Sequence, residues 1–397
     1  MLYPFAAAYY SLKNRRQISS LAVSDLDTAE HLWGGPDYSK AFRNVLVGPP
    51  ERRGEIWQAW ITTGDVELPD GHAFYILRHR TENSGRLLDR WALYCALDIN
   101  DPALFIHEDV LPEGVERARQ ATEACETDMA PIFVGCDEEL SKELRHLLEK
   151  GAAGEVPLLV YEENDLSTHE IWPLELGATA DRIRELFREA PLFLLDGHHR
   201  LAAAKENHRL GMGDGKILAC LCSMGPSDTL ILPIHRTVHY ERWMLPDSLY
   251  ADLVRAGCKI TELSELKVSS IPQFIETNSS MEPYCIVVHS YSAKPNLVQL
   301  PISAKLPSQL AALSVACLDY GVMEQHPQAT CIPVASFDSA LEQLALDQSQ
   351  AAFFLPPASP AEVRAIALSR LKMPRKSTRF VPKPALGLLC RPWTNSG

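Results

Sequence analysis

The chain has 397 residues, of which 46% are hydrophobic and 22% are charged. This length and composition indicate two or three globular domains and exclude a chain that is mainly disordered, collagen-like or coiled-coil. The formal net charge of -13 argues against nonspecific binding to nucleic acid, because a polyanion repels an acidic protein.

The cysteines and the apolar runs indicate the cellular compartment in which the protein resides. The ten cysteines are scattered without a Cys-x-x-Cys pair, so they offer no zinc framework and indicate a reducing compartment. Cys220 and Cys222 would lie on one face of a strand as buried side chains. No run reaches about 18 apolar residues and the first residues lack a basic region. We therefore expect a cytoplasmic protein with no membrane span.

The first region, residues 1–100, mixes short apolar runs with Gly and Pro and is expected to be rich in β-sheet. Aromatic and β-branched residues predict strands at Ala73–Arg78 and Trp91–Ile99.

In the second region, residues 101–240, short apolar runs alternate with segments of helical period, which is typical of an α/β core. Strands are predicted at Ile132–Val134, Pro157–Glu162, Leu192–Leu195, Ile217–Cys222 and Thr229–Ile234. Helices are predicted at Glu113–Glu126, Glu138–Lys150, Ala180–Arg188 and His199–Arg209, the last capped by Gly211.

The third region, residues 241–397, is expected to form a C-terminal α/β region with a basic, Pro-rich tail. Its predicted strands are Tyr284–His289 and Ala351–Leu355, and its predicted helices are Ser308–Leu318, Ser336–Asp347 and Pro360–Leu371. The expected fold class for the whole chain is α+β.

The most informative segment is Asp196-Gly197-His198-His199-Arg200, which lies between an apolar strand and an amphipathic helix. Gly197 permits a sharp turn, and the free amides at the start of the helix favour an anion such as phosphate. Arg200 can grip phosphate oxygens, the two histidines can donate hydrogen bonds, and Asp196 can hold Mg²⁺. The alternative is a capped helix with two surface histidines.

A second polar segment, His107-Glu108-Asp109, follows an apolar run and precedes a helix. Glu108 is a candidate general base, which Arg117 could keep ionised. The alternative is that these residues complement the helix dipole.

The basic tail gathers cations and hydroxyls around prolines between Met373 and Pro384, including Lys376, Ser377, Thr378 and Lys383. Such a segment could close over phosphates. The alternative is a solvated basic tail.

Three other patterns do not predict a site. Gly211–Lys216 follows a helix and precedes a strand, the reverse of the order in a phosphate loop. His235 and His239 lie in a strand-like stretch, too far apart to share a metal ion. No Gly-x-Ser-x-Gly motif indicates a covalent nucleophile.

Taken together, six segments resemble the family called domain of unknown function 1015, relatives of free-serine kinases in the ParB/sulfiredoxin-like superfamily. The resemblance spans nearly the whole chain. The matching segments are Tyr3-Pro4-Phe5, His107-Glu108 with Glu116-Arg117, Ala130-Pro131-Ile132-Phe133, Asp196-Gly197-His198-His199-Arg200, Leu232-Pro233-Ile234-His235-Arg236, and Met373-Pro374-Arg375-Lys376-Ser377-Thr378 with Pro382-Lys383.

The resemblance implies a central ParB-like core in which the Asp-Gly-His-His-Arg segment holds nucleotide phosphates and Mg²⁺. It also implies that the glutamate matching Glu108 deprotonates the hydroxyl of a free amino acid. The family usually has Thr two residues after this glutamate, whereas this chain has Val110, which we expect to reshape the acceptor pocket. A sulfiredoxin-like reaction is disfavoured because His198 stands in place of that branch's reactive cysteine.

We therefore expect an enzyme that transfers a phosphoryl group from ATP or ADP, with Mg²⁺, to the hydroxyl of a small metabolite such as serine. The expected catalytic residues are Glu108, His198 and Arg200, and the expected metal ligand is Asp196. The expected nucleotide-binding residues are Gly197, His199, Arg200, Lys376, Ser377, Thr378 and Lys383. A phosphoester or nucleotide hydrolase and a non-catalytic nucleotide-binding regulator are the alternatives, no nucleic-acid or membrane partner is expected, and the oligomeric state is left open.

Overall fold

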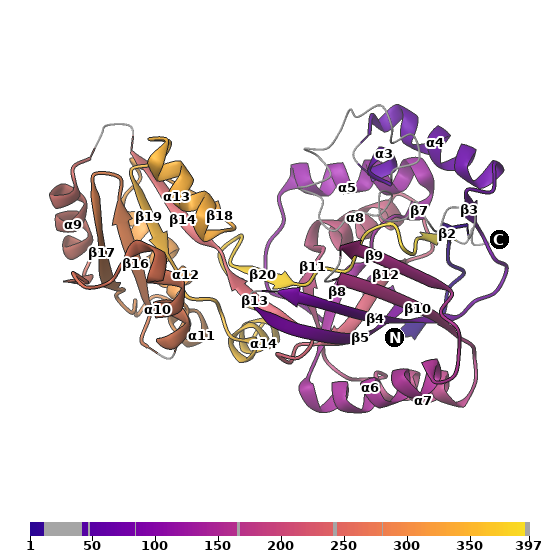
Figure 1. Cartoon of the computed structure of the whole chain (residues 1–397). Helices are drawn as coiled ribbons and strands as arrows, with labels where there is room; N and C mark the ends of the chain where they lie inside the picture. Colours follow the sequence, from indigo (N-terminus) through magenta and orange to yellow (C-terminus); the bar gives the residue numbers. More distant parts are fainter. Residues whose placement is uncertain are drawn as a thin grey trace. The chain divides into compact units, whose positions relative to one another are not determined.

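The computed structural model describes residues 1–11, 42–46, 48–83, 85–164, 167–240, 244–279 and 281–393, which form two compact units (Figure 1). The first unit comprises Met1–Ile106, Val110–Leu230 and Phe380–Gly397, and the second comprises His107–Asp109 and Ile231–Arg379. The chain thus passes between the units at residues 106–107, 109–110, 230–231 and 379–380. Each unit combines a sheet with helices, so the predicted α+β class is confirmed.

The first unit contains a nine-stranded mixed sheet in the order β6-β11-β8-β12-β5-β4-β10-β9, with β1 paired to β5. Its strands are β1 (Leu2–Tyr3), β4 (Phe74–Asn83), β5 (Arg86–Asp98), β6 (Leu104–Ile106), β8 (Ile132–Cys136), β9 (Leu159–Asn164), β10 (Ser167–Leu174), β11 (Leu192–Asp196) and β12 (Lys216–Ser223). β11 runs parallel to β6, and the register aligns Leu194 with Ile106. The carboxyl ends of these two strands therefore lie at the same edge of the sheet.

Helices cover both faces of this sheet, α6 and α7 on one side and α3, α4, α5 and α8 on the other (Figure 1). Their bounds are α3 (Arg43–Leu46), α4 (Pro50–Thr62), α5 (Pro112–Cys125), α6 (Glu138–Ala152), α7 (Ala178–Leu186) and α8 (His198–Arg209). Because both faces are covered, every residue of β8 is buried, as expected of an apolar run without alternation. Two short pairs join β2 (Tyr9–Tyr10) to β3 (Val66–Glu67) and β7 (Thr127–Asp128) to β21 (Arg391–Pro392).

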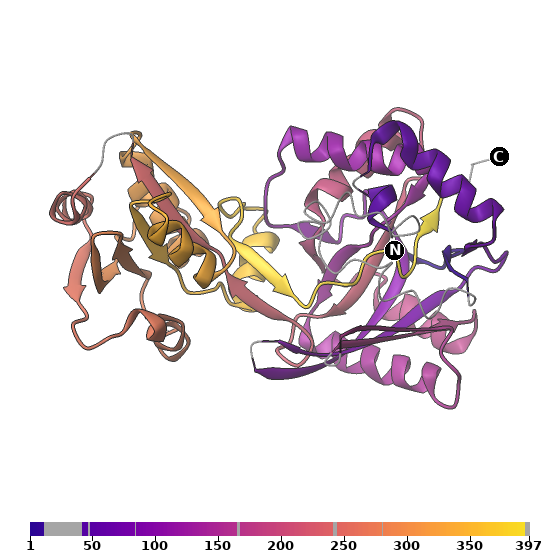
Figure 2. The ribbon, with the colours of Figure 1, turned by 45° about the horizontal axis from the view of Figure 1, so that its top comes forward.

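The last part of the chain returns to the first unit, where the yellow segment lies among its helices and strands (Figure 2). Buried Leu388, Leu389 and Cys390 pack into the unit. Arg391 ion-pairs with Asp128 and Asp214, both at 2.8 Å. These contacts hold residues 388–391 in the first unit.

The second unit contains a six-stranded sheet in the order β15-β17-β16-β19-β14-β18. Its strands are β14 (His235–Tyr240), β15 (Lys259–Glu262), β16 (Tyr284–His289), β17 (Ser292–Gln299), β18 (Ala329–Val334) and β19 (Ala351–Phe354), while β13 (Leu230–Pro233) and β20 (Thr378–Val381) contain unit boundaries. Its α-helices are α9 (Pro246–Arg255), α10 (Ile271–Thr277), α11 (Ser308–Ala311), α12 (Ser314–Ala316), α13 (Phe337–Ala345) and α14 (Pro360–Leu368). Helices α10 and α13 share an apolar cluster with β16 and β19.

Most predicted elements are confirmed, with two differences. The single helix predicted at Ser308–Leu318 is divided into α11, α12 and the start of a π-helix at Cys317–Val322. The region 1–100, predicted to be sheet-rich, also contains the 13-residue helix α4.

All ten cysteines are free, and Cys220 and Cys222 are buried as expected. Within the described ranges, no helix is long and apolar enough to cross a bilayer.

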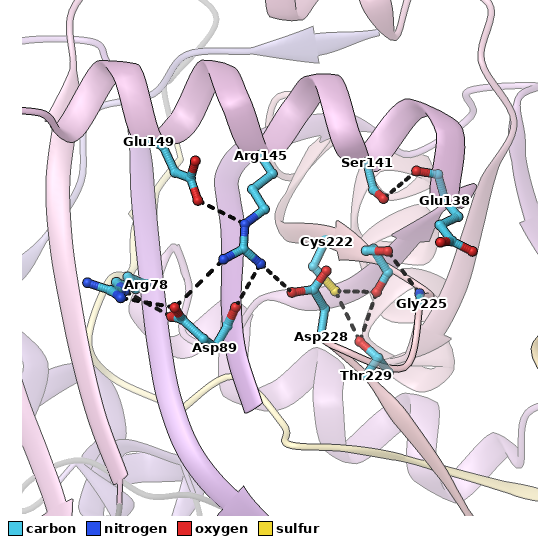
Figure 3. A network of polar contacts seen from close by, with 11 residues as sticks. Arg78, Asp89, Glu138, Ser141, Arg145, Glu149, Cys222, Gly225, Asp228 and Thr229 are labelled. Atoms are coloured by element: carbon cyan, nitrogen blue, oxygen red, sulfur yellow. Dashed lines mark hydrogen bonds and ion pairs between the residues drawn. The ribbon is translucent and has the colours of Figure 1, made fainter. Parts of the chain in front are cut away.

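A network of charges connects α6 to the sheet of the first unit (Figure 3). Arg145 lies between Asp89 and Asp228, at 3.7 and 3.8 Å, and also pairs with Glu149 at 2.8 Å. Arg78 donates two hydrogen bonds of 2.9 Å to Asp89. Asp228 is the most buried of the three carboxylates, with a side chain 10% exposed, and its ion pair is long. Burial raises the pKa of Asp228 to about 6, although Arg145 and Arg90 oppose this shift.

We expect Asp228→Asn to stabilise the protein at pH 7 by about 1–3 kcal/mol and to have little effect below pH 4. The native pKa of Asp228 exceeds the unfolded value, so the native state binds the proton more tightly. The stability that this tighter proton binding contributes is fully present below about pH 4 and is lost as the pH rises through about 6. Urea denaturation at both pH values measures the effect, with Asp181→Asn, an exposed carboxylate, as the control. An equal effect at both pH values would contradict this account.

Candidate functional site

The Asp-Gly-His-His-Arg segment forms the predicted junction between a strand and a helix. β11 ends at Asp196, Gly197 has φ 95°, and α8 begins at His198. A Cβ atom at Gly197 would lie 2.9 Å from both Arg200 Nη2 and Ile132 Cγ2. Glycine is therefore required here both by the left-handed backbone and by the close approach of the arginine.

We expect Gly197→Ala to lower the free energy of unfolding by about 1–3 kcal/mol, because alanine is strained in the left-handed region. Urea denaturation measures this loss. Gly71→Ala is the matched control, since a Cβ atom there meets nothing within 4 Å. Equal stability of the two variants would show that the Gly197 turn relaxes freely.

Asp196 lies between two cations. Arg200 Nη2 donates to Asp196 Oδ2 at 2.8 Å, and Lys383 Nζ lies 3.5 Å from Oδ1. Burial opposes ionisation, yet Arg200, Lys383 and His198 outweigh it and lower the pKa of Asp196 to about 2. About a third of the side chain remains exposed (34%), so an ionised carboxylate is accessible at this junction.

The two histidines of the junction have different surroundings. His199 Nε2 accepts a hydrogen bond of 3.0 Å from the amide of Leu111, the residue before α5. A Cβ atom at Gly114 would lie 2.4 Å from the His199 ring, so glycine lets α5 pack against this histidine. His198, the first residue of α8, contributes to the low pKa of Asp196. The hydrogen bond between Leu111 and His199 thus holds the first residue before α5 against α8.

A buried arginine that the sequence analysis did not identify supports Lys383. Arg90 on β5 is fully buried and donates to the carbonyl of Pro382, the residue before Lys383. Its guanidinium also bonds His79 Nδ1 at 3.0 Å and lies 5.0 Å from the centre of the Phe133 ring. Arg90 immediately precedes the strand predicted at Trp91–Ile99, and no local pattern marked it as a site residue.

Glu108 is held by consecutive backbone amides in the second unit. Its Oε1 accepts hydrogen bonds from the amides of Ser377 (3.1 Å) and Thr378 (3.3 Å) and from the Thr378 hydroxyl (3.2 Å). Its Oε2 accepts one from the amide of Lys376 at 3.3 Å. Burial raises the pKa of Glu108, and these hydrogen bonds, which favour the charged form, oppose the rise. The side chain is thus a partly buried carboxylate with a raised basicity.

The structure therefore groups the candidate residues into two sets. The first unit contains Asp196, Gly197, His198, His199, Arg200 and Lys383, and the second contains Glu108, Lys376, Ser377 and Thr378. The chain passes from one unit to the other two residues after Glu108 and again between Thr378 and Lys383.

Among described residues, no group of three or more His, Cys, Asp or Glu side chains could hold a metal ion. Asp196 offers a single carboxylate, and its oxygens contact Arg200 and Lys383. Mg²⁺ often binds through one or two carboxylates together with substrate phosphates and water. A magnesium ion at Asp196 would therefore need further ligands from the phosphates of a nucleotide and from water.

The family model described as "Protein of unknown function (DUF1015)" matches residues 43–330. No curated protein matches the sequence. A solved free serine kinase in complex with AMP is 12% identical, with 74% of this chain and 91% of that chain covered and a TM-score of 0.39. A conserved hypothetical protein from Pyrococcus furiosus is 11% identical, with 75% and 93% covered and a TM-score of 0.39. SbnI with a C-terminal truncation, from Staphylococcus aureus, is 13% identical, with 75% and 87% covered and a TM-score of 0.40.

Proposed function

The chain belongs to the DUF1015 family of proteins of unknown function, and we propose that it is a nucleotide- and Mg²⁺-dependent phosphotransferase. Its proposed acceptor is the hydroxyl of a small metabolite, with free serine or a serine-like amino acid as the first candidate. ATP and ADP are both candidate donors. The proposal rests on the charges and hydrogen bonds of the two residue sets and on the family resemblance of their motifs.

The observation that carries the proposal is the register of β6 and β11. These parallel strands align Ile106 with Leu194. Glu108 and Asp196 each follow two residues after the aligned pair. In open sheets that contain parallel strands, ligands commonly bind at the carboxyl ends of the strands. This topology supports a ligand site at the edge of the first unit's sheet where β11 ends at Asp196.

The first set supplies groups suited to phosphates. The amides at the start of α8 favour an anion, and Arg200 and Lys383 add positive charge. Under the proposal, Arg200 and His198 stabilise charge on the transferred phosphoryl group. Asp196 helps hold Mg²⁺, which neutralises phosphate charge when bound. Gly197 and His199 help position the phosphates.

In the second set, Glu108 is the proposed general base. Burial raises its pKa, which makes the carboxylate a better proton acceptor than an exposed glutamate. It would accept the proton of the acceptor hydroxyl as the oxygen attacks phosphorus and the bond to the leaving nucleotide breaks. Lys376, Ser377 and Thr378 border this carboxylate and are proposed to contribute to nucleotide binding.

The test is to incubate the purified protein with Mg²⁺, ATP or ADP, and a panel of hydroxylated amino acids, and to identify products by mass spectrometry. Stoichiometric formation of a phosphorylated amino acid and the shortened nucleotide is expected. Inorganic phosphate released at the same rate without an acceptor would favour the hydrolase alternative. Nucleotide binding in calorimetry without any product would favour the regulator alternative.

A further inference from the structure

Two consecutive peptide groups of the basic tail lie between Arg236 and Glu108, within the second unit. In the first group, the carbonyl of Arg375 accepts a hydrogen bond from Arg236 Nη2 at 3.2 Å, and the amide of Lys376 donates to Glu108 at 3.3 Å. In the second group, the carbonyl of Lys376 accepts from Arg236 Nη1 at 3.0 Å, and the amide of Ser377 donates to Glu108 at 3.1 Å. Each peptide group thus contacts the cation with its oxygen and the anion with its N–H.

This alignment has a local cause in the backbone. Lys376 has φ 54°, a left-handed conformation that allows neighbouring N–H groups to point to the same side. The side chains of Arg375 and Lys376 are exposed, so their backbone atoms make these contacts. Hydrogen bonds arranged in series polarise one another, so a cation at the oxygen end strengthens the N–H as a donor.

Arg236 is itself firmly oriented. Its side chain is 1% exposed, and its Nη2 bonds Asp319 Oδ2 at 2.9 Å. Nε lies 3.2 and 3.3 Å from the two oxygens of the same carboxylate. The planar guanidinium held by Asp319 can therefore direct separate N–H groups at the two carbonyls.

We propose that Arg236 is a positioning residue for Glu108, acting through the peptide groups Arg375–Lys376 and Lys376–Ser377. Its role in catalysis rests on the proposed function, whereas the coupling between Arg236 and Glu108 does not. This assigns a role to the arginine of the Leu-Pro-Ile-His-Arg motif, and it identifies Asp319 as the residue that orients the arginine.

Hydrogen exchange with mass spectrometry tests the coupling without requiring activity. We expect Arg236→Gln to accelerate exchange at the amides of Lys376 and Ser377 roughly two- to tenfold, the change that corresponds to losing one typical hydrogen bond. The control is Arg255→Gln, which removes an arginine paired with an aspartate in the same unit and should leave these amides unchanged.

A double-mutant cycle separates coupling from two independent contacts. If the peptide groups transmit the effect, the Arg236→Gln, Glu108→Gln double variant will exchange about as fast as the faster single variant. Rate increases that multiply would overturn the proposal. Should Arg236→Gln fail to fold, Arg236→Lys serves instead, because one ammonium cannot reproduce the planar fork. Unchanged exchange in that variant would equally overturn the proposal.

Measurements of kcat distinguish a positioning role of Arg236 from a purely structural one. Arg236→Lys is expected to lower kcat in the wild-type background and to have no further effect in the Glu108→Gln background. An equal fold reduction in both backgrounds would refute the positioning role. If the wild-type protein transfers no phosphoryl group, the proposed function fails, while the exchange cycle still decides whether Arg236 and Glu108 are coupled.

Discussion

Glu108→Gln is expected to reduce kcat for phosphoryl transfer by about 10²- to 10⁴-fold, the usual contribution of a positioned general base. The substitution preserves the shape of the side chain but removes the proton acceptor. The measurement is the rate of product formation with saturating nucleotide and acceptor. Glu113→Gln, the same substitution at an exposed position in the first turn of α5, should retain the wild-type rate.

The fold of the Glu108→Gln variant requires its own control, because the carboxylate accepts hydrogen bonds from three amides. Thermal unfolding and nucleotide binding by calorimetry show whether a loss of turnover reflects chemistry. Activity in the wild-type protein should fall as the pH drops through the raised pKa of Glu108, because the protonated carboxyl cannot act as a base. Undiminished turnover in the variant would remove Glu108 from the role of base.

Arg391→Met is expected to lower the free energy of unfolding by about 3–5 kcal/mol, because it removes the cation that two buried carboxylates share, and the Lys216 ammonium lies 3.9 Å from one of them, Asp214. Arg391 is 3% exposed, and its partners Asp128 and Asp214 are 5% and 6% exposed. The arginine also donates to the carbonyl of Lys216 at 2.6 Å. Urea denaturation followed by circular dichroism measures the loss.

The control for this variant is Arg182→Met, which breaks an exposed ion pair with Glu143 and should cost at most about 1 kcal/mol. Equal losses in the two variants would show that the buried ion pairs of Arg391 contribute no more than a surface pair.

The sequence predicted those elements in which a local pattern and tertiary packing agree. The strand Tyr284–His289 was predicted at its observed bounds, and all six of its residues are buried. The helix predicted at Ser308–Leu318 is interrupted instead. Leu313 has an extended backbone (ψ 124°), and the hydroxyl of Ser314 accepts a hydrogen bond from the amide of Tyr284. The residue that bonds Ser314 lies 30 positions away in the sequence. The hydrophobic period of the segment itself therefore does not reveal where the helix is interrupted.

Helix α4 was not predicted, although its sequence has features that are typical of a helix. Pro50 is its first residue, as is common in helices, and Trp57 and Trp60 are buried at a spacing of three residues. Gly54, which resembles loop punctuation, permits close packing, since a Cβ atom there would lie 2.3 Å from the carbonyl oxygen of Ala124. A glycine inside a helix thus served packing and not a turn.

For the candidate site, the sequence predicted the junction at Gly197 and drew attention to Lys383, whose ammonium lies near Asp196. The roles of these residues remain predictions. Arg90 and Asp319 could not be identified from local sequence, because their contacts involve distant parts of the chain. Arg90 contacts a carbonyl 292 residues away, and Asp319 pairs with an arginine 83 residues away. Such partners become visible only when the fold is known.

The return of residues 380–393 to the first unit has a consequence for biosynthesis. When the ribosome has completed β12, every strand of the nine-stranded sheet has been made. Residues 380–393, which also belong to the first unit, have not yet been made. The emerging chain would expose apolar surface, and leave Asp128 and Asp214 without Arg391, until residues 380–393 have been made. We accordingly expect a fragment that stops at Leu230 to aggregate, and co-expression with a peptide of residues 380–393 to improve its solubility.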